Sequence, residues 1–179
     1  WHYLYMRDVW VDTGTSPTVF RYIDWLITVP LQIVEFYLIL AAVTAVSARV
    51  FWKLLIASIV MLLGGYLGET GVLGVSETAG FVVGMAGWLY IIYEIFKGEA
   101  SQLNENSGNI ASQNAFKTIR LIVTVGWAIY PIGYFLGMGE ANTSGTLDIV
   151  YNLADLINKA AFGLAIWVAA TSDSASSSH

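Results

Sequence analysis

Tyr151-Asn-Leu-Ala-Asp155-Leu-Ile-Asn-Lys159-Ala-Ala-Phe-Gly-Leu-Ala-Ile-Trp167 places one lysine in the middle of a stretch that is otherwise apolar enough to lie in hydrocarbon. The apolar run from Leu147 to Ala170 reaches the ~20 residues that a helix needs to span a bilayer. Lys159 falls near its centre, where a charge costs at least ~2.5 kcal/mol. Asp155 lies one turn earlier on the same helical face, so its carboxylate can pair with the amine. An ionisable pair inside a membrane span indicates a functional site.

The composition of the whole chain fits a membrane protein. Of its 179 residues, 56% are hydrophobic and 12% are charged, which is too apolar for a soluble domain of this size. The sequence has no cysteine, which excludes disulfides, thiolate nucleophiles and cysteine metal sites, and no metal site is expected. The net charge is −5, and no basic tract suits nucleic acid. The chain therefore predicts a polytopic membrane protein.

The amino-terminal stretch has the character of the end of a span. The chain begins at Trp1, without an initiator methionine, a signal peptide or a polar leader. We therefore expect a piece of a larger protein. Residues 8–17 combine alternating apolar residues with a Thr-Gly turn, which predicts a short hairpin-like connection.

Five apolar runs follow, each long enough to cross a bilayer as a helix. Only helices and closed barrels satisfy the backbone in lipid, and these runs lack the alternation of strands. We therefore predict an all-α membrane helix bundle that forms a single domain over residues 1–179. The polar segment 98–113 predicts a mobile loop. The expected spans are approximately residues 19–45, 50–68, 76–96, 116–138 and 147–170.

Charged residues alternate between the connections and thereby predict the orientation, because short cytoplasmic loops collect Lys and Arg. The first and third connections between full spans carry bases, whereas the second and fourth carry acids alone. We therefore expect the first full span to enter from the outside and the Ser-rich carboxy terminus to lie in the cytoplasm. The bases are Arg49, Lys53, Lys97, Lys117 and Arg120, and the acids are Glu69, Glu77, Glu140 and Asp148.

A stripe of polar side chains runs along the first full span. At ~100° per residue, their spacing of three or four residues keeps them within a third of the circumference. Such a stripe in lipid either ties helices together through hydrogen bonds or carries protons. Asp24 and Glu35 lie roughly 16 Å apart along the helix, and they favour proton transfer because unpaired charge in a membrane is expensive. The stripe consists of Arg21, Asp24, Thr28, Gln32 and Glu35.

The fourth full span presents aromatic rings on one face, formed by Trp127, Tyr130, Pro131 and Tyr134. Aromatic residues at helical spacing usually form core, but the proline opens a helix locally. A wall of flat rings that faces a membrane lysine would suit a long planar ligand. His2 is either a capping or interfacial residue or a hydrogen-bond partner of the first carboxylate of the stripe. Further pocket candidates, each of which alone also fits ordinary packing, are Trp25, Met61, Gly64, Gly65 and Trp88.

Three motifs resemble those of microbial rhodopsins, and most specifically those of proteorhodopsins. They are Arg21-Tyr-x-Asp24-Trp with Thr28 and Glu35, Trp127-Ala-x-Tyr130-Pro131, and Asn152-Leu-Ala-Asp155-x-x-Asn-Lys159. The resemblance covers nearly the whole chain. It implies a seven-helix fold, of which this chain holds the end of the second helix and the five that follow. It also implies a light-driven ion transporter rather than an enzyme, located in the inner (plasma) membrane of a bacterium and assembled as a homo-oligomer of five or six subunits.

The resemblance further implies a cofactor and a proton path. Lys159 would carry all-trans-retinal as a protonated Schiff base. Asp24 would be the counterion and proton acceptor, and Asp155 a second counterion. Glu35 would return a proton from the cytoplasmic side, so that net transport would be outward.

The remaining site residues also follow from the resemblance. Arg21 would keep the outer carboxylates ionised, Thr28 would hydrogen-bond near the acceptor, and His2 would tune that acceptor. Gln32 occupies a position where relatives carry either an apolar residue or glutamine. A fixed amide dipole near the Schiff-base nitrogen favours the ground state, so we predict the blue-absorbing type. The retinal pocket would be lined by Trp25, Gln32, Met61, Gly65, Trp88, Trp127, Tyr130, Pro131 and Tyr134.

Other functions remain compatible with the sequence. The main alternative is a photosensory rhodopsin that signals to a partner with little net transport, although a donor at Glu35 speeds a turnover that a sensor does not need. Sodium and chloride pumps of the family carry other residues at the positions of Asp24 and Thr28. A retinal-free structural or transport bundle would leave Lys159 unexplained. For proton release the sequence does not choose between Glu69, Glu77, Glu140 and Asp148.

Overall fold

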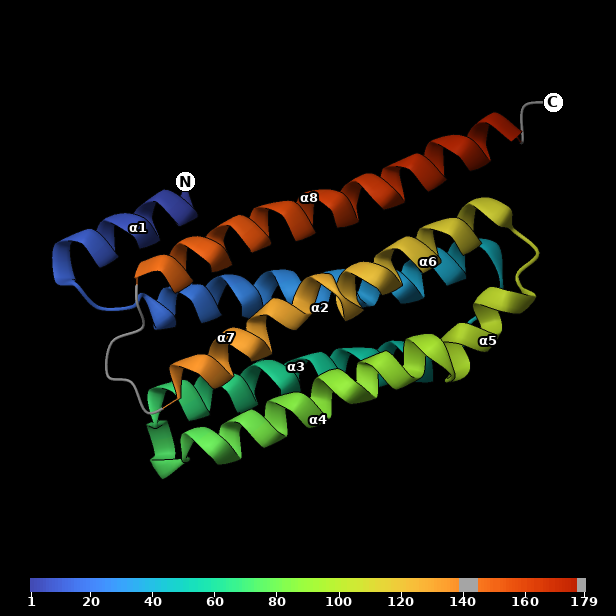
Figure 1. Ribbon diagram of the computed structural model, residues 1–179. Helices are drawn as coiled ribbons and strands as arrows, with labels where there is room; N and C mark the ends of the chain where they lie inside the picture. Colours follow the sequence, from blue (N-terminus) through green and yellow to red (C-terminus); the bar gives the residue numbers. More distant parts are fainter. Residues whose placement is uncertain (139–144, 177–179) are drawn as a thin grey trace.

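The computed structural model describes residues 1–138 and 145–176. Within these ranges the regular elements are helices, and they form an elongated bundle (Figure 1). The all-α membrane bundle that the sequence predicts is thus confirmed. Glu140, a candidate for proton release, lies outside the described residues. The helices are α1 (His2–Thr13), α2 (Thr18–Val43), α3 (Ala48–Thr70), α4 (Glu77–Phe96), α5 (Glu99–Asn106), α6 (Ile110–Thr124), α7 (Ile129–Gly137) and α8 (Gly145–Ser176), with 3₁₀ turns η1 (Val72–Gly74) and η2 (Gly126–Ala128).

Within the part of the chain that the structure describes, five helical stretches are long and apolar enough to cross a membrane. Their outward faces carry exposed Leu, Ile and Val side chains, which would be costly in water and are suited to lipid. The chain is a multi-pass membrane protein. The stretches are Thr18–Val43, Ala48–Thr70, Glu77–Asn106, Ile110–Gly137 and Asp148–Ser174.

The hairpin predicted for residues 8–17 is wrong, because α1 continues to Thr13. The helix ends at Gly14, whose φ of 67° lies in the left-handed region that glycine adopts without strain. The Gly14 N–H donates to the carbonyl of Trp10 over 2.8 Å. The alternation of apolar residues in this stretch therefore belongs to a helix with a glycine cap.

The loop predicted for residues 98–113 is also wrong in part, because α5 occupies Glu99–Asn106. Two contacts hold this short helix at one end of α3 and α4. The buried carboxylate of Glu94 accepts the backbone N–H of Ala100 over 3.2 Å, and Lys53 Nζ lies 3.1 Å from Glu99 Oε2. Docking thus stabilises a helix that is too short to form alone.

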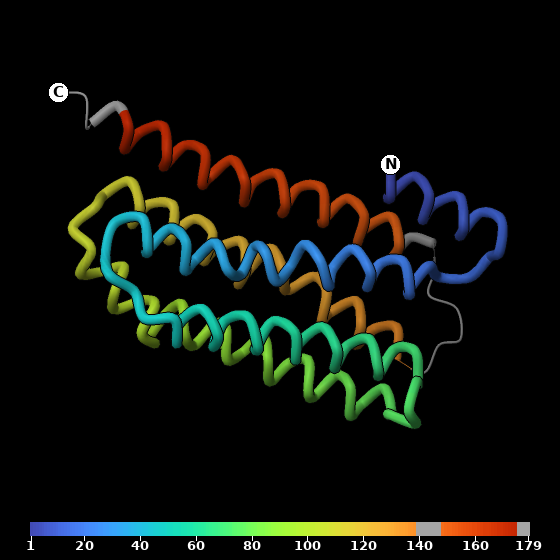
Figure 2. The backbone as a smooth tube through the Cα atoms, turned by 180° about the vertical axis from the view of Figure 1, so that it is seen from behind, coloured from blue at the N-terminus to red at the C-terminus, as the bar shows by residue number. Residues whose placement is uncertain are grey.

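Helices α3 and α4 pack closely along their length, as Figures 1 and 2 both show. Glycines on both helices make this approach possible. A Cβ atom on Gly80 would run into the Gly68 Cα and the Gly64 carbonyl oxygen. The tight pair packs against α2 through α3.

The fourth span is interrupted at η2, between α6 and α7. Pro131 lacks an N–H, so an unbroken α-helical ladder is impossible at this level. The carbonyl of Val123 accepts the indole N–H of Trp88 over 3.0 Å. The break that Pro131 predicts is therefore observed, and Trp88 of α4 binds a carbonyl near the end of α6, just before it.

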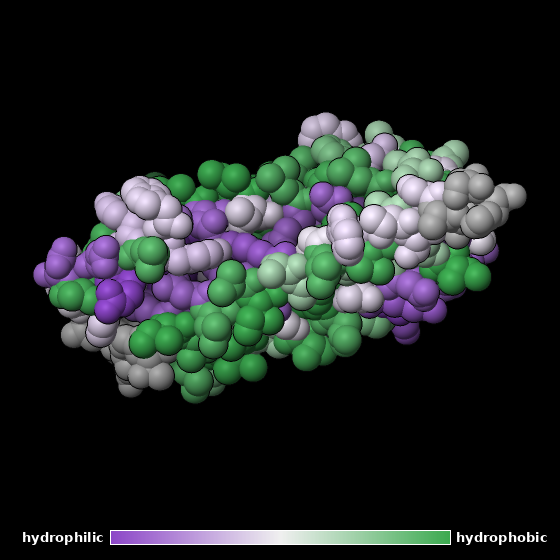
Figure 3. Space-filling model, turned by 90° about the horizontal axis from the view of Figure 1, so that it is seen from above, coloured by the Kyte–Doolittle hydropathy of each residue, from purple (hydrophilic) through white to green (hydrophobic). Residues whose placement is uncertain are grey.

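The surface of the bundle is unevenly polar. Seen from above, hydrophilic residues gather at one end and along the middle of the molecule, flanked by hydrophobic ones (Figure 3). This is the face on which α1 and α8 lie (Figure 1). The central lysine of α8 is 22% exposed and Asp24 of α2 is 16% exposed.

Candidate functional site

Three helices bring polar groups to the amine of Lys159. The amine forms an ion pair with Asp24 Oδ2, from α2. It also donates to the hydroxyl of Tyr3, from α1, over 2.8 Å, and lies 3.6 Å from Asp155 Oδ2, one turn earlier on α8. Two carboxylates therefore compensate one cation in the interior of the bundle.

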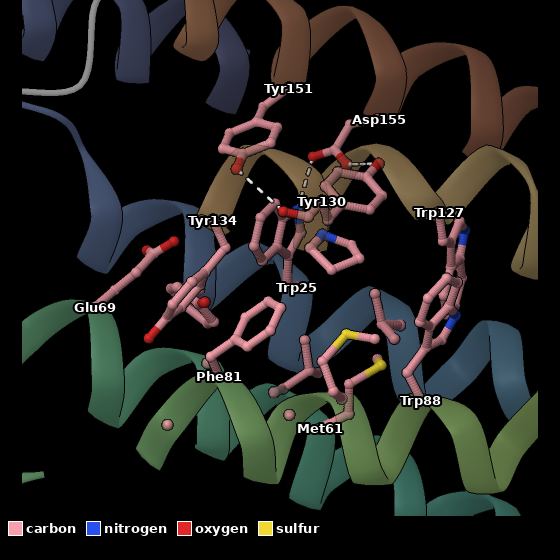
Figure 4. A pocket seen from close by; sticks show the side chains of 18 of the residues that line it. Trp25, Met61, Glu69, Phe81, Trp88, Trp127, Tyr130, Tyr134, Tyr151 and Asp155 are labelled. Carbon is pink, nitrogen blue, oxygen red and sulfur yellow. Dashed lines mark hydrogen bonds between the residues drawn. The ribbon is translucent and has the colours of Figure 1, made fainter. Parts of the chain in front are cut away.

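The carboxylate of Asp155 is held by fixed neutral donors. Trp25 Nε1 donates to Oδ2 over 2.9 Å, and the hydroxyl of Tyr130 donates to Oδ1 over 2.5 Å. The Asp155 residue is 2% exposed. Dashed lines in Figure 4 mark these hydrogen bonds, which tie α8 to α2 and α7. Both oxygens are thus occupied by groups that cannot rotate away freely.

Asp24 is less constrained. Its Oδ2 accepts the hydroxyl of Tyr3 over 3.4 Å in addition to the lysine contact. Thr28 Oγ1 donates to the backbone carbonyl of Asp24 over 3.0 Å and not to the carboxylate. His2 Nε2 lies 2.9 Å from the carbonyl oxygen of Phe20, and no hydrogen bond joins His2 to Asp24 among the described residues. Thr28 and His2 are therefore neighbours of Asp24 whose bonds go to the α2 backbone.

Arg21 points away from the carboxylates around Lys159. It forms a buried ion pair with Asp148 at the start of α8, and Nη2 donates to Ser16 Oγ over 3.1 Å. Its guanidinium carbon lies 4.8 Å from the ring centroid of Tyr151. The sequence placed Arg21 correctly on the polar stripe but did not identify Asp148 as its partner.

A pocket runs alongside this polar centre. Its empty space, counted out to the open mouth, is about 810 Å³. Figure 4 shows Trp88 and Trp127 at one end, Trp25 near the centre, and Glu69 and Tyr134 at the other end. The predicted residues that line it are Trp25, Gln32, Met61, Gly65, Trp88, Trp127, Tyr130, Pro131, Tyr134, Asp155 and Lys159.

Glu35 lies outside this pocket, on α2 beyond Gln32. It is partly buried. Next to it, the fully buried rings of Phe36 and Phe116 are in edge-to-face contact, with centroids 5.0 Å apart.

Four residues of this site were missed or left undecided by the sequence. Tyr3 links Lys159 to Asp24, and Asn158 bonds the backbone of η2. Glu69 lines the pocket with a buried Oε2 that has no hydrogen-bond partner within the described part of the chain. The spacing of Tyr151, Asp155 and Asn158 on one face of α8 was the available signal for Asn158 and Tyr151.

The lining suits an elongated apolar ligand with a carbonyl end. Aromatic rings and Met61 supply flat apolar walls, and an amine compensated by acids lies among the lining residues. An amine of this kind can form a Schiff base with a carbonyl group. The residues present therefore fit retinal.

Comparisons with known proteins give the same result. The family described as bacteriorhodopsin-like protein matches residues 1–173. The chain is 54% identical over 177 residues to the blue-light absorbing proteorhodopsin of Gamma-proteobacterium Hot 75m4, covering 97% of this chain and 69% of the relative. It is 52% identical over 176 residues to the green-light absorbing proteorhodopsin of Gamma-proteobacterium EBAC31A08, covering 97% and 70%.

A solved structure agrees. The crystal structure of blue light-absorbing proteorhodopsin from Med12 matches with a TM-score of 0.78 and 63% identity, covering 97% of this chain and 76% of that chain. Retinal is the chromophore of this family. The chain belongs to the bacteriorhodopsin-like family of seven-helix microbial rhodopsins, within its proteorhodopsin group.

Proposed function

We propose that the protein is a light-driven outward proton pump whose retinal is attached to Lys159 as a protonated Schiff base. The observation that carries this proposal is the position of the Lys159 amine, between Asp24 and Asp155 and beside the aromatic pocket. When bound, retinal supplies light absorption and an isomerisation that transiently lowers the proton affinity of the attached nitrogen. Residues 1–179 then act as one transmembrane retinal-binding domain.

Asp24 is the proton acceptor in this proposal. It touches the Lys159 amine directly, and Tyr3 bridges the two groups with a hydroxyl. Asp155 serves as the second counterion, because two neutral donors already occupy its oxygens and hydrogen bonds to a charged acceptor are each worth ~1.5–3 kcal/mol. Thr28 fixes the α2 backbone at the acceptor, and His2 tunes it from the neighbouring turn.

Glu35 is the donor that refills the nitrogen from the inner side. It lies roughly 16 Å further along α2 than Asp24, which separates it from the outer half of the bundle. A proton that leaves outward and returns from Glu35 gives net outward transport.

Glu69 is the best placed of the release candidates. Its buried Oε2 lacks a partner within the described residues, and it lines the end of the pocket away from Trp88 and Trp127. Asp148 is already paired with Arg21, and Glu77 engages other groups. We therefore assign release to Glu69, with Arg21 keeping the outer region polar.

The proposal also covers the absorption colour, the membrane location and the assembly of the pump. Relatives of both colours are 52–54% identical to the chain, so overall identity does not decide the colour. Gln32, which lines the pocket, supports blue absorption. We further propose an inner-membrane protein with a cytoplasmic carboxy terminus, assembled as a ring of five or six copies.

Illumination of cells that express the full-length protein with all-trans-retinal tests the pump. The expected result is external acidification that a protonophore abolishes and that Lys159→Ala eliminates together with the visible band. Lys97→Ala, at an exposed lysine after α4, is the matched control and should pump normally. Acidification that survives in Lys159→Ala would refute the proposal. A visible band with recovery over seconds and no acidification would favour the photosensory alternative.

A further inference from the structure

One face of α8 is bonded to the break between α6 and α7. Tyr151, Asp155 and Asn158 share this face because they are spaced by four and three residues. The hydroxyl of Tyr151 donates to the backbone carbonyl of Tyr130 over 3.3 Å, and Asp155 accepts the Tyr130 hydroxyl. Asn158 Nδ2 donates to the carbonyl of Gly126 over 3.1 Å and lies 3.5 Å from the Tyr130 hydroxyl. Three side chains of α8 thus converge on Gly126 and Tyr130, the two ends of the stretch 126–130.

The segment that they hold is a natural hinge. The Ala128 N–H donates to the carbonyl of Val125 in the 3₁₀ pattern, and Pro131 follows three residues later. A short 3₁₀ stretch inside a longer helix marks a place where the two halves can pivot. The side-chain hydrogen bonds from α8 therefore restrain η2, where the α-helical backbone hydrogen bonds are interrupted.

Asn158 fits this point without spare room. Its side chain is 8% exposed. A Cβ atom added to Gly126 would collide with the Asn158 Oδ1. A methyl group at position 126 would therefore displace the Asn158 amide from its present place.

Asn158 also precedes Lys159 in the chain. A displacement of α8 at the lysine therefore moves Asn158 relative to Gly126. The Tyr130 hydroxyl, which lies near Asn158, is at the same time bound to the Asp155 carboxylate beside the amine. The lysine and the hinge are therefore connected through the backbone and through one shared hydroxyl.

We propose that Asn158 is a positioning residue that locks the α6–α7 hinge in the dark, and that a change at Lys159 releases it. The amide of Asn158 holds Gly126 while the Lys159 amine is paired with Asp24. A shift of the lysine withdraws that amide, and α6 pivots about η2. The release step rests on the proposed function, whereas the lock in the dark does not.

Asn158→Leu in the full-length protein tests the lock, because leucine has a similar size but donates no hydrogen bond. In the dark, hydrogen exchange of the backbone amides of residues 126–130 should rise about tenfold, as expected for the loss of one buried hydrogen bond. The decay of the deprotonated state after a flash should change by a similar factor, while the absorption maximum stays unchanged. Asn114→Ala, at an exposed asparagine on α6, should alter neither measurement. Unchanged exchange at residues 126–130 in Asn158→Leu would overturn the proposal.

A second test changes the side-chain sizes at Gly126 and Asn158. It remains informative if Asn158→Leu fails to fold. Gly126→Ala should accelerate exchange at the hinge because its methyl group displaces the amide. Combining it with Asn158→Ala removes the colliding atoms, so the double variant should behave like Asn158→Ala alone. Independent, additive effects would refute the contact. If the unaltered protein did not pump protons in the light, the proposed function would be refuted. The hydrogen-exchange test of the lock in the dark would remain valid.

Discussion

Removing one hydroxyl, in Tyr130→Phe, tests whether Asp155 carries a negative charge. The Tyr130 hydroxyl donates to Asp155 Oδ1 over 2.5 Å at a carboxylate that is 2% exposed. A hydrogen bond to a charged acceptor contributes ~1.5–3 kcal/mol, against ~0.5–1.5 kcal/mol for a neutral one. Tyr130→Phe should therefore lower the free energy of unfolding by ~1.5–3 kcal/mol. Trp25 Nε1 and Lys159 then remain as the described partners of Asp155.

Tyr134 provides the matched control, since it lies one turn later on α7. Its hydroxyl donates to the backbone carbonyl of Glu77, a neutral acceptor, over 3.0 Å. Tyr134→Phe should cost only ~0.5–1.5 kcal/mol. Both full-length variants would be unfolded by titration with SDS in mixed micelles, with helix content and the visible band as the signals. Equal losses would contradict an ionised Asp155, and a larger loss for Tyr134→Phe would refute the whole electrostatic argument.

Three further predictions follow from the site and the fold. Gln32→Leu should move the visible band of the full-length protein to longer wavelength, and an unchanged absorption spectrum would remove Gln32 from the tuning role. Glu35→Gln should slow the decay of the deprotonated state by about 100-fold or more, as expected when a proton donor is lost, and an unchanged flash decay would assign the donor elsewhere. Gly87→Val places a Cβ 2.8 Å from Met61 N and 2.9 Å from the carbonyl oxygen of Ala57. It should cost ~1–3 kcal/mol by overpacking, measured by SDS titration, and full stability would show that α3 and α4 separate freely.

The bundle was predictable because lipid leaves the backbone few choices. A long apolar run in hydrocarbon must be helical, and that rule needs no knowledge of contacts. The two wrong predictions, for residues 8–17 and 98–113, concern segments at the ends of the spans. There a single glycine cap at Gly14 and a docked carboxylate at Glu94 decide the outcome. Local composition does not reveal the second of these, because Glu94 acts from a neighbouring helix.

The site was predictable where its charged groups cost free energy inside a membrane span. A lysine and two aspartates in apolar helices are expected to pair because unpaired charge in a membrane is costly. The structure places them in contact. The Tyr3 hydroxyl and the Arg21–Asp148 pair were not predicted, because neither a tyrosine nor an acid near the end of a span signals a comparable cost in the sequence. Tyrosine occurs in hydrophobic cores as well as in proton paths. The residue type alone therefore does not indicate a functional role.

The direction of transfer follows from how differently the two aspartates are bound. Asp155 has a neutral donor on each oxygen, one from the buried ring of Trp25 and one from the partly buried ring of Tyr130. Asp24 shares one oxygen with Lys159 and the Tyr3 hydroxyl. Protonating Asp155 would weaken two hydrogen bonds from ~1.5–3 kcal/mol to ~0.5–1.5 kcal/mol each, whereas protonating Asp24 mainly removes the ion pair that the transfer itself neutralises. In the proposed pump the amine therefore has one ready acceptor, on α2, although two carboxylates surround it.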